Sequence, residues 1–158
     1  MAWTALTFGQ YAGKTLPQVV LSDPDYFFWG MEQGIFKGRG ALESEAKDIF
    51  HKATHIKIPA NNLGELCVEY WFDPNVGKFS HFDIVPADRG AHQGSSPTTR
   101  SELVDMSLPR QCAEYDKTGG KALIKSLKYH VFGDENIKLT KARCEAFFDN
   151  NDNFLGIA

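Results

Sequence analysis

The 158-residue sequence predicts a compact α+β protein that is mostly helical, with a small antiparallel sheet built on one β-hairpin at about residues 66–85. Two observations predict this class. Segments with the apolar spacing of helices lie near both ends of the chain, and two alternating runs typical of strands lie in the middle. An apolar content of 42% is sufficient for a core. We expect two units, residues 1–58 and residues 59–158, the second packed as one body.

The first unit is expected to contain a short hairpin followed by two helices. In residues 6–16, two glycines can supply the positive φ angles that a tight turn needs. Residues 22–34 begin with two candidate N-caps, continue with Pro24 at the first helical position and end at Gly34, which predicts a helix. Residues 41–55 predict a second helix, because their apolar side chains recur at helical spacing.

The clearest strand signal is a hairpin in which "LCVEYWF" and "KFSHFDIV" flank the turn "DPNVG". With Phe72 opposite Lys78, one face is nearly all apolar, and a slip of one residue would mix the two faces. The apolar face receives Leu66, Val68, Tyr70, Phe72, Ser80, Phe82 and Ile84, and the other face receives Cys67, Glu69, Trp71, Phe79, His81 and Asp83. This register places Glu69 opposite His81.

The remainder of the chain predicts a long loop and two helices. Residues 87–100 contain glycine, serine and proline without a large apolar side chain, which is typical of a mobile surface loop. Residues 119–133 predict an amphipathic helix with lysines on its outer face. Residues 139–150 predict a last helix, with Thr140 as its N-cap.

Composition excludes several classes of protein. The net charge of −3 provides no global positive field of the kind that many nucleic-acid-binding proteins have. The three cysteines form no Cys-x-x-Cys pair, which argues against a disulfide scaffold or a zinc ribbon and favours a reducing compartment. The N-terminus has no secretory signal, and no run of about 18 apolar residues occurs. We therefore expect a cytoplasmic protein with no membrane partner.

Two linked motifs stand near the N-terminus, Phe8-Gly9-x-Tyr11-x-Gly13-Lys14-Thr15-Leu16 and then Asp23-Pro24-x-Tyr26-x-x-Trp29. Over about residues 4–55, this pattern resembles the C-terminal module of exodeoxyribonuclease X and its relatives. The resemblance implies a small non-catalytic module that accompanies exonuclease domains and assists with nucleic acid. This chain has Gln10 and Ala12 where the family commonly has lysine, so fewer cations are available to neutralise phosphates. The resemblance therefore supports the fold more than the function.

The first functional hypothesis is a non-catalytic accessory protein that binds nucleic acid. Residues 110–143 carry eight basic and four acidic side chains, and form the one segment with a clear positive balance. The candidate binding residues are Tyr11, Lys14, Lys117, Lys121, Lys125, Lys128, Lys138, Lys141 and Arg143. In this hypothesis the cations contact phosphates, and the Tyr11 ring stacks on bases.

The second hypothesis is a small protein–protein interaction or inhibitor protein of phage or mobile-element origin. It would dock on its protein partner through Trp71 and Phe79 and through the loop at residues 87–100. Residues 61–109 carry seven acidic and three basic side chains, which suits a basic partner.

The third hypothesis is a metal-dependent hydrolase. Glu69, His81 and Asp83 lie on the same predicted face of the hairpin, and two carboxylates with an imidazole can bind a divalent metal ion or exchange protons. Apart from that metal, we expect no cofactor.

Overall fold

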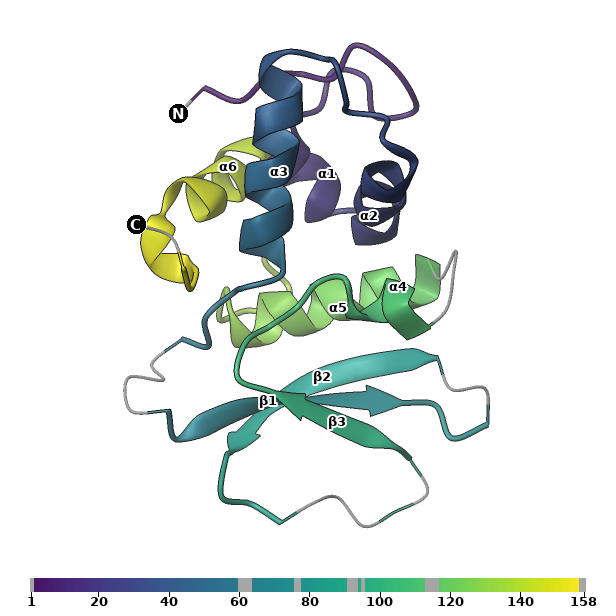
Figure 1. The fold of residues 1–158 in the computed structure, drawn as a ribbon. Helices are drawn as coiled ribbons and strands as arrows, with labels where there is room; N and C mark the ends of the chain where they lie inside the picture. Colours follow the sequence, from purple (N-terminus) through teal and green to yellow (C-terminus); the bar gives the residue numbers. More distant parts are fainter. Residues whose placement is uncertain are drawn as a thin grey trace.

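The computed structural model of the protein describes residues 2–59, 64–75, 78–90, 94, 96–112 and 117–156. Within these residues it contains helices, a three-stranded sheet and one 3₁₀ turn (Figure 1). In chain order the elements are α1 (Leu16–Val20), α2 (Pro24–Gln33), α3 (Ala41–Ala53), β1 (Leu66–Phe72), β2 (Phe79–Pro86), β3 (Thr98–Ser101), α4 (Leu108–Cys112), α5 (Lys117–His130), α6 (Lys141–Asp149) and the 3₁₀ turn Asn151–Asn153. The predicted α+β class is confirmed.

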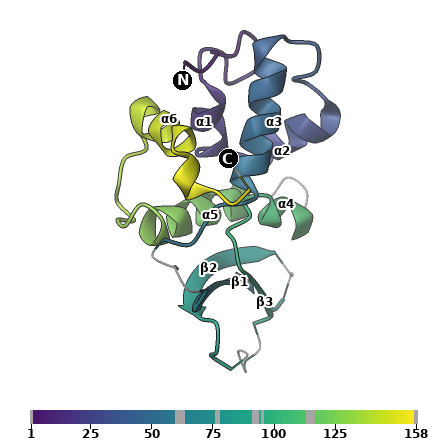
Figure 2. The ribbon, with the colours of Figure 1, turned by 60° about the vertical axis from the view of Figure 1, so that its left-hand side comes forward.

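The elements form three layers, which Figures 1 and 2 show from two directions. Helices α1, α2, α3 and α6 make a helical layer, α4 and α5 lie beneath it, and the sheet lies on the far side of α5. Although α6 is last in the sequence, it packs against α1, and one continuous apolar core joins both halves of the chain. The helical layer therefore combines segments on both sides of residue 58.

The predicted helix after residue 22 is confirmed in its start and its end. Asp23 is the N-cap, and its side chain accepts a hydrogen bond from the backbone N–H of Tyr26 at 3.2 Å. Pro24 is the first residue of α2, and Gly34 ends the helix with a left-handed φ of 70°. The predicted second helix, α3, is also present and ends two residues earlier than expected.

Residues 6–16 do not form the strands of a hairpin. The segment is instead a closed loop, in which Leu6 N donates to Lys14 O and Gly13 N donates to Leu6 O, both at 2.8 Å. Gly9 has a φ of 72°, which the turn requires. The chain then enters α1, which the sequence did not predict, and the Gln18 side chain accepts a hydrogen bond from Thr15 N at 3.0 Å at its start.

The predicted register of the hairpin is wrong by two residues, and a bulge changes one of its faces. Tyr70 pairs with Phe82 and Trp71 with His81, whereas Phe72 pairs with Phe79. The two-residue shift keeps the apolar side chains of both strands on the same face. The irregularity after Trp71 leaves Ser80 out of the pairing and turns Phe79 onto the face of Phe72, which is the core face.

The predicted long loop is partly a strand. Residues 98–101 form β3, which pairs antiparallel with β1, so that the sheet order is β2-β1-β3. Residues 91–93 and 95 of this predicted loop lie outside the described residues. The two C-terminal helices are confirmed: α5 begins two residues earlier than expected, and Thr140 caps α6 by accepting a hydrogen bond from Arg143 N at 3.2 Å.

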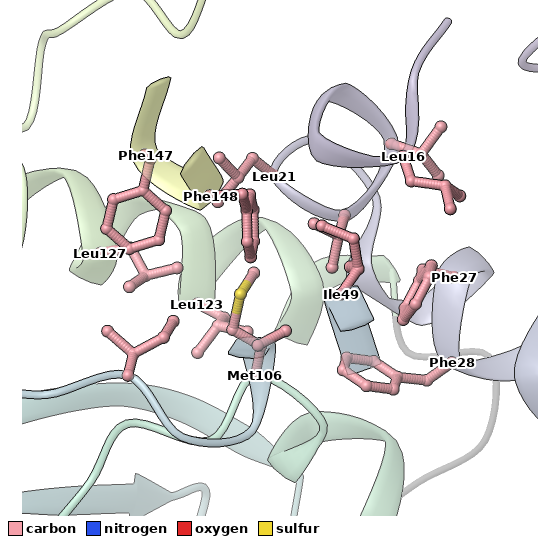
Figure 3. Close-up of a cluster of buried hydrophobic side chains, with 14 of the residues drawn as sticks. Leu16, Leu21, Phe27, Phe28, Ile49, Met106, Leu123, Leu127, Phe147 and Phe148 are labelled. Atoms are coloured by element: carbon pink, nitrogen blue, oxygen red, sulfur yellow. The ribbon is translucent and has the colours of Figure 1, made fainter. Parts of the chain in front are cut away.

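Part of the core lies between α5 and the helical layer (Figure 3), and the core continues to the inner face of the sheet. Phe148 of α6 is 0% exposed, stacks on Phe154 with ring centroids 5.5 Å apart and contacts Phe147 edge to face at 5.2 Å. Its carbonyl accepts a hydrogen bond at 2.9 Å from Nζ of Lys52, a buried lysine that also pairs with Asp48 at 3.1 Å. Phe148 therefore joins the C-terminal helix to the N-terminal helices.

We expect replacement of Phe148 by Ala to lower the free energy of unfolding by about 3–5 kcal/mol, because the cavity left among rigid rings cannot collapse. Urea denaturation would measure this decrease. Ala146 lies exposed on the same helix, so Ala146→Ser is the matched control and should change stability by less than about 0.5 kcal/mol. Similar decreases in both variants would contradict this packing.

Candidate functional site

A cleft of about 430 Å³ lies between α5 and strand β2. It is lined by residues of two elements and by one residue of the loop after α5: Ser80, His81, Phe82, Asp83, Ala122, Lys125, Ser126, Tyr129, His130 and Glu135. The cleft brings together His81 and Asp83 from the predicted metal set and Lys125 from the predicted basic helix. Residues from two different hypotheses therefore share one surface.

The cleft exists because α5 covers the edge of the sheet. Strand β2 is an edge strand, and Phe82 N points away from β1 and donates to Ser126 Oγ of α5 at 3.3 Å. An uncovered edge strand exposes unpaired backbone groups and invites aggregation, so a helix held there by a side-chain hydrogen bond protects the sheet. The face of α5 beyond Ser126 is left open to solvent, and Lys125 and Tyr129 lie on it.

Tyr129 and His130 form the aromatic part of the cleft. Tyr129 is 59% exposed, and its ring contacts that of His130 edge to face with centroids 4.8 Å apart. His130 Nε2 lies 3.3 Å from Asp83 Oδ1. Burial lowers the pKa of His130 below its ordinary 6.5; the nearby Asp83 carboxylate acts in the opposite direction and His81 lowers the pKa further.

The lysines of α5 follow the same open side of the helix. Lys121, Lys125 and Lys128 are spaced four and three residues apart, so they lie along one face. Lys121 and Lys125 are exposed, and Lys128 is half-buried. Lys117 is the first residue of α5, and its side chain lies outside the described part of the structure.

The other predicted nucleic-acid residues lie elsewhere. The closed loop that contains Tyr11 and Lys14 is at the end of the helical layer far from the sheet, and α6 also belongs to that layer (Figures 1 and 2). The set consists of Tyr11 and Lys14 in this loop and Lys138, Lys141 and Arg143 in and before α6. The structure therefore does not join the loop of Lys14 and the α5 lysines into one compact surface.

Tyr11 has a structural role. Its hydroxyl donates to Asp23 Oδ2 at 2.5 Å, and its ring contacts Tyr26 edge to face at 4.9 Å. Burial and this hydrogen bond raise the pKa of Tyr11. The ring is half-buried and holds the N-terminal loop against the start of α2, which leaves it poorly placed to stack on a base.

The three residues of the predicted metal site have separate partners. Glu69 lies opposite Asp83, not opposite His81, and is 3% exposed. Its carboxylate accepts from Arg100 Nε at 2.9 Å, whereas Asp83 contacts His130 and the His81 ring stacks on Trp71 at 5.5 Å. Among the described residues, no group of three or more His, Cys, Asp or Glu side chains is placed to hold a metal ion.

The predicted docking pair, Trp71 and Phe79, is divided between the two faces of the sheet. The bulge turns Phe79 into the core, where it is 5% exposed and contacts Tyr70. Trp71 remains half-buried on the opposite face, stacked on the exposed His81. The expectation that both rings form one exposed patch is therefore wrong, because alternation in the sequence does not reveal the bulge.

A larger hollow of about 750 Å³ shares no lining residue with this cleft, and its walls include residues 56–59, the start of β1, Asp152, Asn153 and Leu155. Of the predicted site residues it contains none. Its charged lining consists of Lys57, Glu102 and Asp152.

Sequence reasoning missed Ser126, Tyr129 and His130. The spacing of Lys125 and Tyr129, one helical turn apart, was a usable signal for an aromatic ring beside a cation. No signal marked the contact of His130 with Asp83, because it depends on how α5 lies across β2.

Comparison of the chain with protein-family models, with curated proteins and with solved structures gave no match. The resemblance of residues 4–55 to the exodeoxyribonuclease X module stays a prediction. Within the described ranges, no helix has both the length and the apolar character needed to cross a bilayer.

Arg100 holds Glu69 and the start of the β2–β3 connection together. Besides Glu69, its guanidinium donates to the carbonyls of Arg89 at 2.7 Å and Gly90 at 3.0 Å. We expect Arg100→Ala to lower the free energy of unfolding by about 3 kcal/mol or less, because it leaves a buried carboxylate unpaired while Arg100 itself is partly exposed.

Urea denaturation of Arg100→Ala would test this. Adding Glu69→Gln should restore part of the stability, since the unpaired buried charge is then removed. Arg89 contributes only its backbone carbonyl to this interaction, so Arg89→Ala is the matched control. An Arg100→Ala variant as stable as this control would show that the contacts of Arg100 with Glu69 and with the two carbonyls do not stabilise the fold.

The lowered pKa of His130 predicts a pH dependence of stability. As the pH falls below 6.5, the unfolded chain takes up the proton before the folded protein does, so the free energy of unfolding should decrease. The decrease should level off below the folded-state pKa. Denaturation at a series of pH values should show a weaker decrease in His130→Gln than in the unmodified protein. Identical pH profiles of the two proteins would show that His130 does not cause the pH dependence of the free energy of unfolding.

Proposed function

We propose that this protein is a non-catalytic accessory protein that binds nucleic acid through the open face of α5 and the cleft beside β2. The observation that carries the proposal is the exposed Tyr129 ring beside Lys125 on one face of α5, above a cleft with two imidazoles. Cations that contact phosphates supply affinity without regard to sequence, and an exposed ring offers a surface on which a base can stack.

The charges of the surface support a modest affinity. The charged residues of the cleft are Lys125, Asp83 and Glu135, and Lys121 and Lys128 add positive charge along α5 outside the cleft lining. The positive excess is local and small, in a protein whose net charge is −3. Binding should therefore be strong only at low ionic strength.

The cleft supports a binding role better than a catalytic one. An aspartate–histidine pair can activate a nucleophile, but within the described residues no serine, threonine or cysteine side chain forms a hydrogen bond with His130. Ser126 instead uses its hydroxyl to accept the hydrogen bond from Phe82 N.

The double variant Lys121→Glu/Lys125→Glu tests the proposal. We expect it to weaken binding to a labelled single-stranded oligonucleotide and to reduce the slope of log affinity against log salt by about 0.7 for each phosphate that the lysines no longer neutralise. Fluorescence anisotropy over a range of about 50–200 mM salt would measure both effects.

Lys47→Glu/Lys57→Glu is the matched control, because it reverses two exposed lysines outside the cleft and changes the net charge equally. The control should keep most of the affinity. Equal weakening in both variants would contradict the assignment to α5. No binding to single or double strands at low salt would remove the proposed function.

A further inference from the structure

We infer that the α5–β2 cleft binds single-stranded nucleic acid in preference to duplex, and that one unpaired base lies against Tyr129. The inference rests on the proposed function and specifies its ligand. It follows from the shape of the α5 surface and from the exposed Tyr129 ring beside the cleft.

The position of α5 argues against a duplex. A helix that reads the major groove must project from the protein surface so that the groove can enclose it. Helix α5 instead lies between the helical layer and the sheet (Figures 1 and 2), with Leu123 and Leu127 fully buried. Its open face borders a hollow and not a ridge. Such a surface admits a flexible strand more readily than a rigid double helix.

One wall of the cleft carries an exposed ring. Tyr129 of α5 is 59% exposed, and its ring contacts that of His130 edge to face with centroids 4.8 Å apart. The ring of His81 on β2 is instead stacked on Trp71, on the face of the sheet opposite the core. Because the contact with His130 restricts Tyr129 before binding, stacking a base on this ring costs less conformational entropy.

A base must leave the duplex to stack on the Tyr129 ring. In a double helix each base is covered on both faces by its neighbours, whereas bases of single strands can be splayed out and stacked on aromatic side chains. Lys121 and Lys125 continue along α5 from Tyr129, and can contact the phosphates that flank such a base.

The experiment compares Tyr129→Ala and Tyr129→Phe with the unmodified protein. The probes are a labelled oligothymidylate of about 12 nucleotides, the corresponding oligouridylate and a duplex of about 12 base pairs, all at low salt. We expect tighter binding to both single strands than to the duplex. Tyr129→Ala should weaken single-strand binding by about 5- to 150-fold, which corresponds to one stacked base. Tyr129→Phe should retain the affinity, because the ring remains.

The outcomes separate the inference from the proposed function. If the duplex binds as tightly as the single strands and Tyr129→Ala has no effect, while Lys121→Glu/Lys125→Glu still weakens binding, the inference is overturned and the proposed function stands. If no probe binds, both fail. Tyr129 is exposed, so unchanged thermal unfolding of Tyr129→Ala would attribute any decrease in affinity to the ring itself.

Discussion

The fold depends on helix α5 packing against two layers at once. Leu123 and Leu127 are fully buried in the core that includes Phe147 and Phe148 of α6, and Ser126 is hydrogen-bonded to the edge strand of the sheet. The apolar face of the three-stranded sheet and the apolar sides of the short helices each have to be buried against another element. Because α5 joins them, its inward residues are fixed by packing, and the remaining side faces solvent.

That geometry explains why the candidate site is where it is. The helix protects the edge of β2, and the space between helix and strand becomes the cleft. Among the residues that this arrangement leaves exposed are Lys121, Lys125 and Tyr129 of α5. The cleft therefore places a cation beside an exposed ring as a consequence of how the sheet edge is covered.

Local patterns in the sequence predicted most of the helices and strands. They predicted less well how the strands pair and how the helices pack on the sheet. The helix from Pro24 was predictable because its cap and its stop are local signals, and the core face of the hairpin was predictable because alternation persists through a two-residue shift. Phe79 was misplaced because nothing in the sequence marks the bulge, and β3 was missed because "TTRS" has no apolar alternation. Lys125 was predicted as a binding residue, but the cleft it lines depends on tertiary packing.

Binding of single strands beside α5 is tested most directly by a titration of ¹⁵N-labelled protein with an oligothymidylate of about 12 nucleotides, followed through backbone amide chemical shifts. We expect the largest changes on Lys121 to His130 of α5 and on Ser80 to Asp83 of β2. Changes confined to the closed loop of residues 6–16 or to α6 would contradict this expectation, since those segments lie in the helical layer away from the cleft.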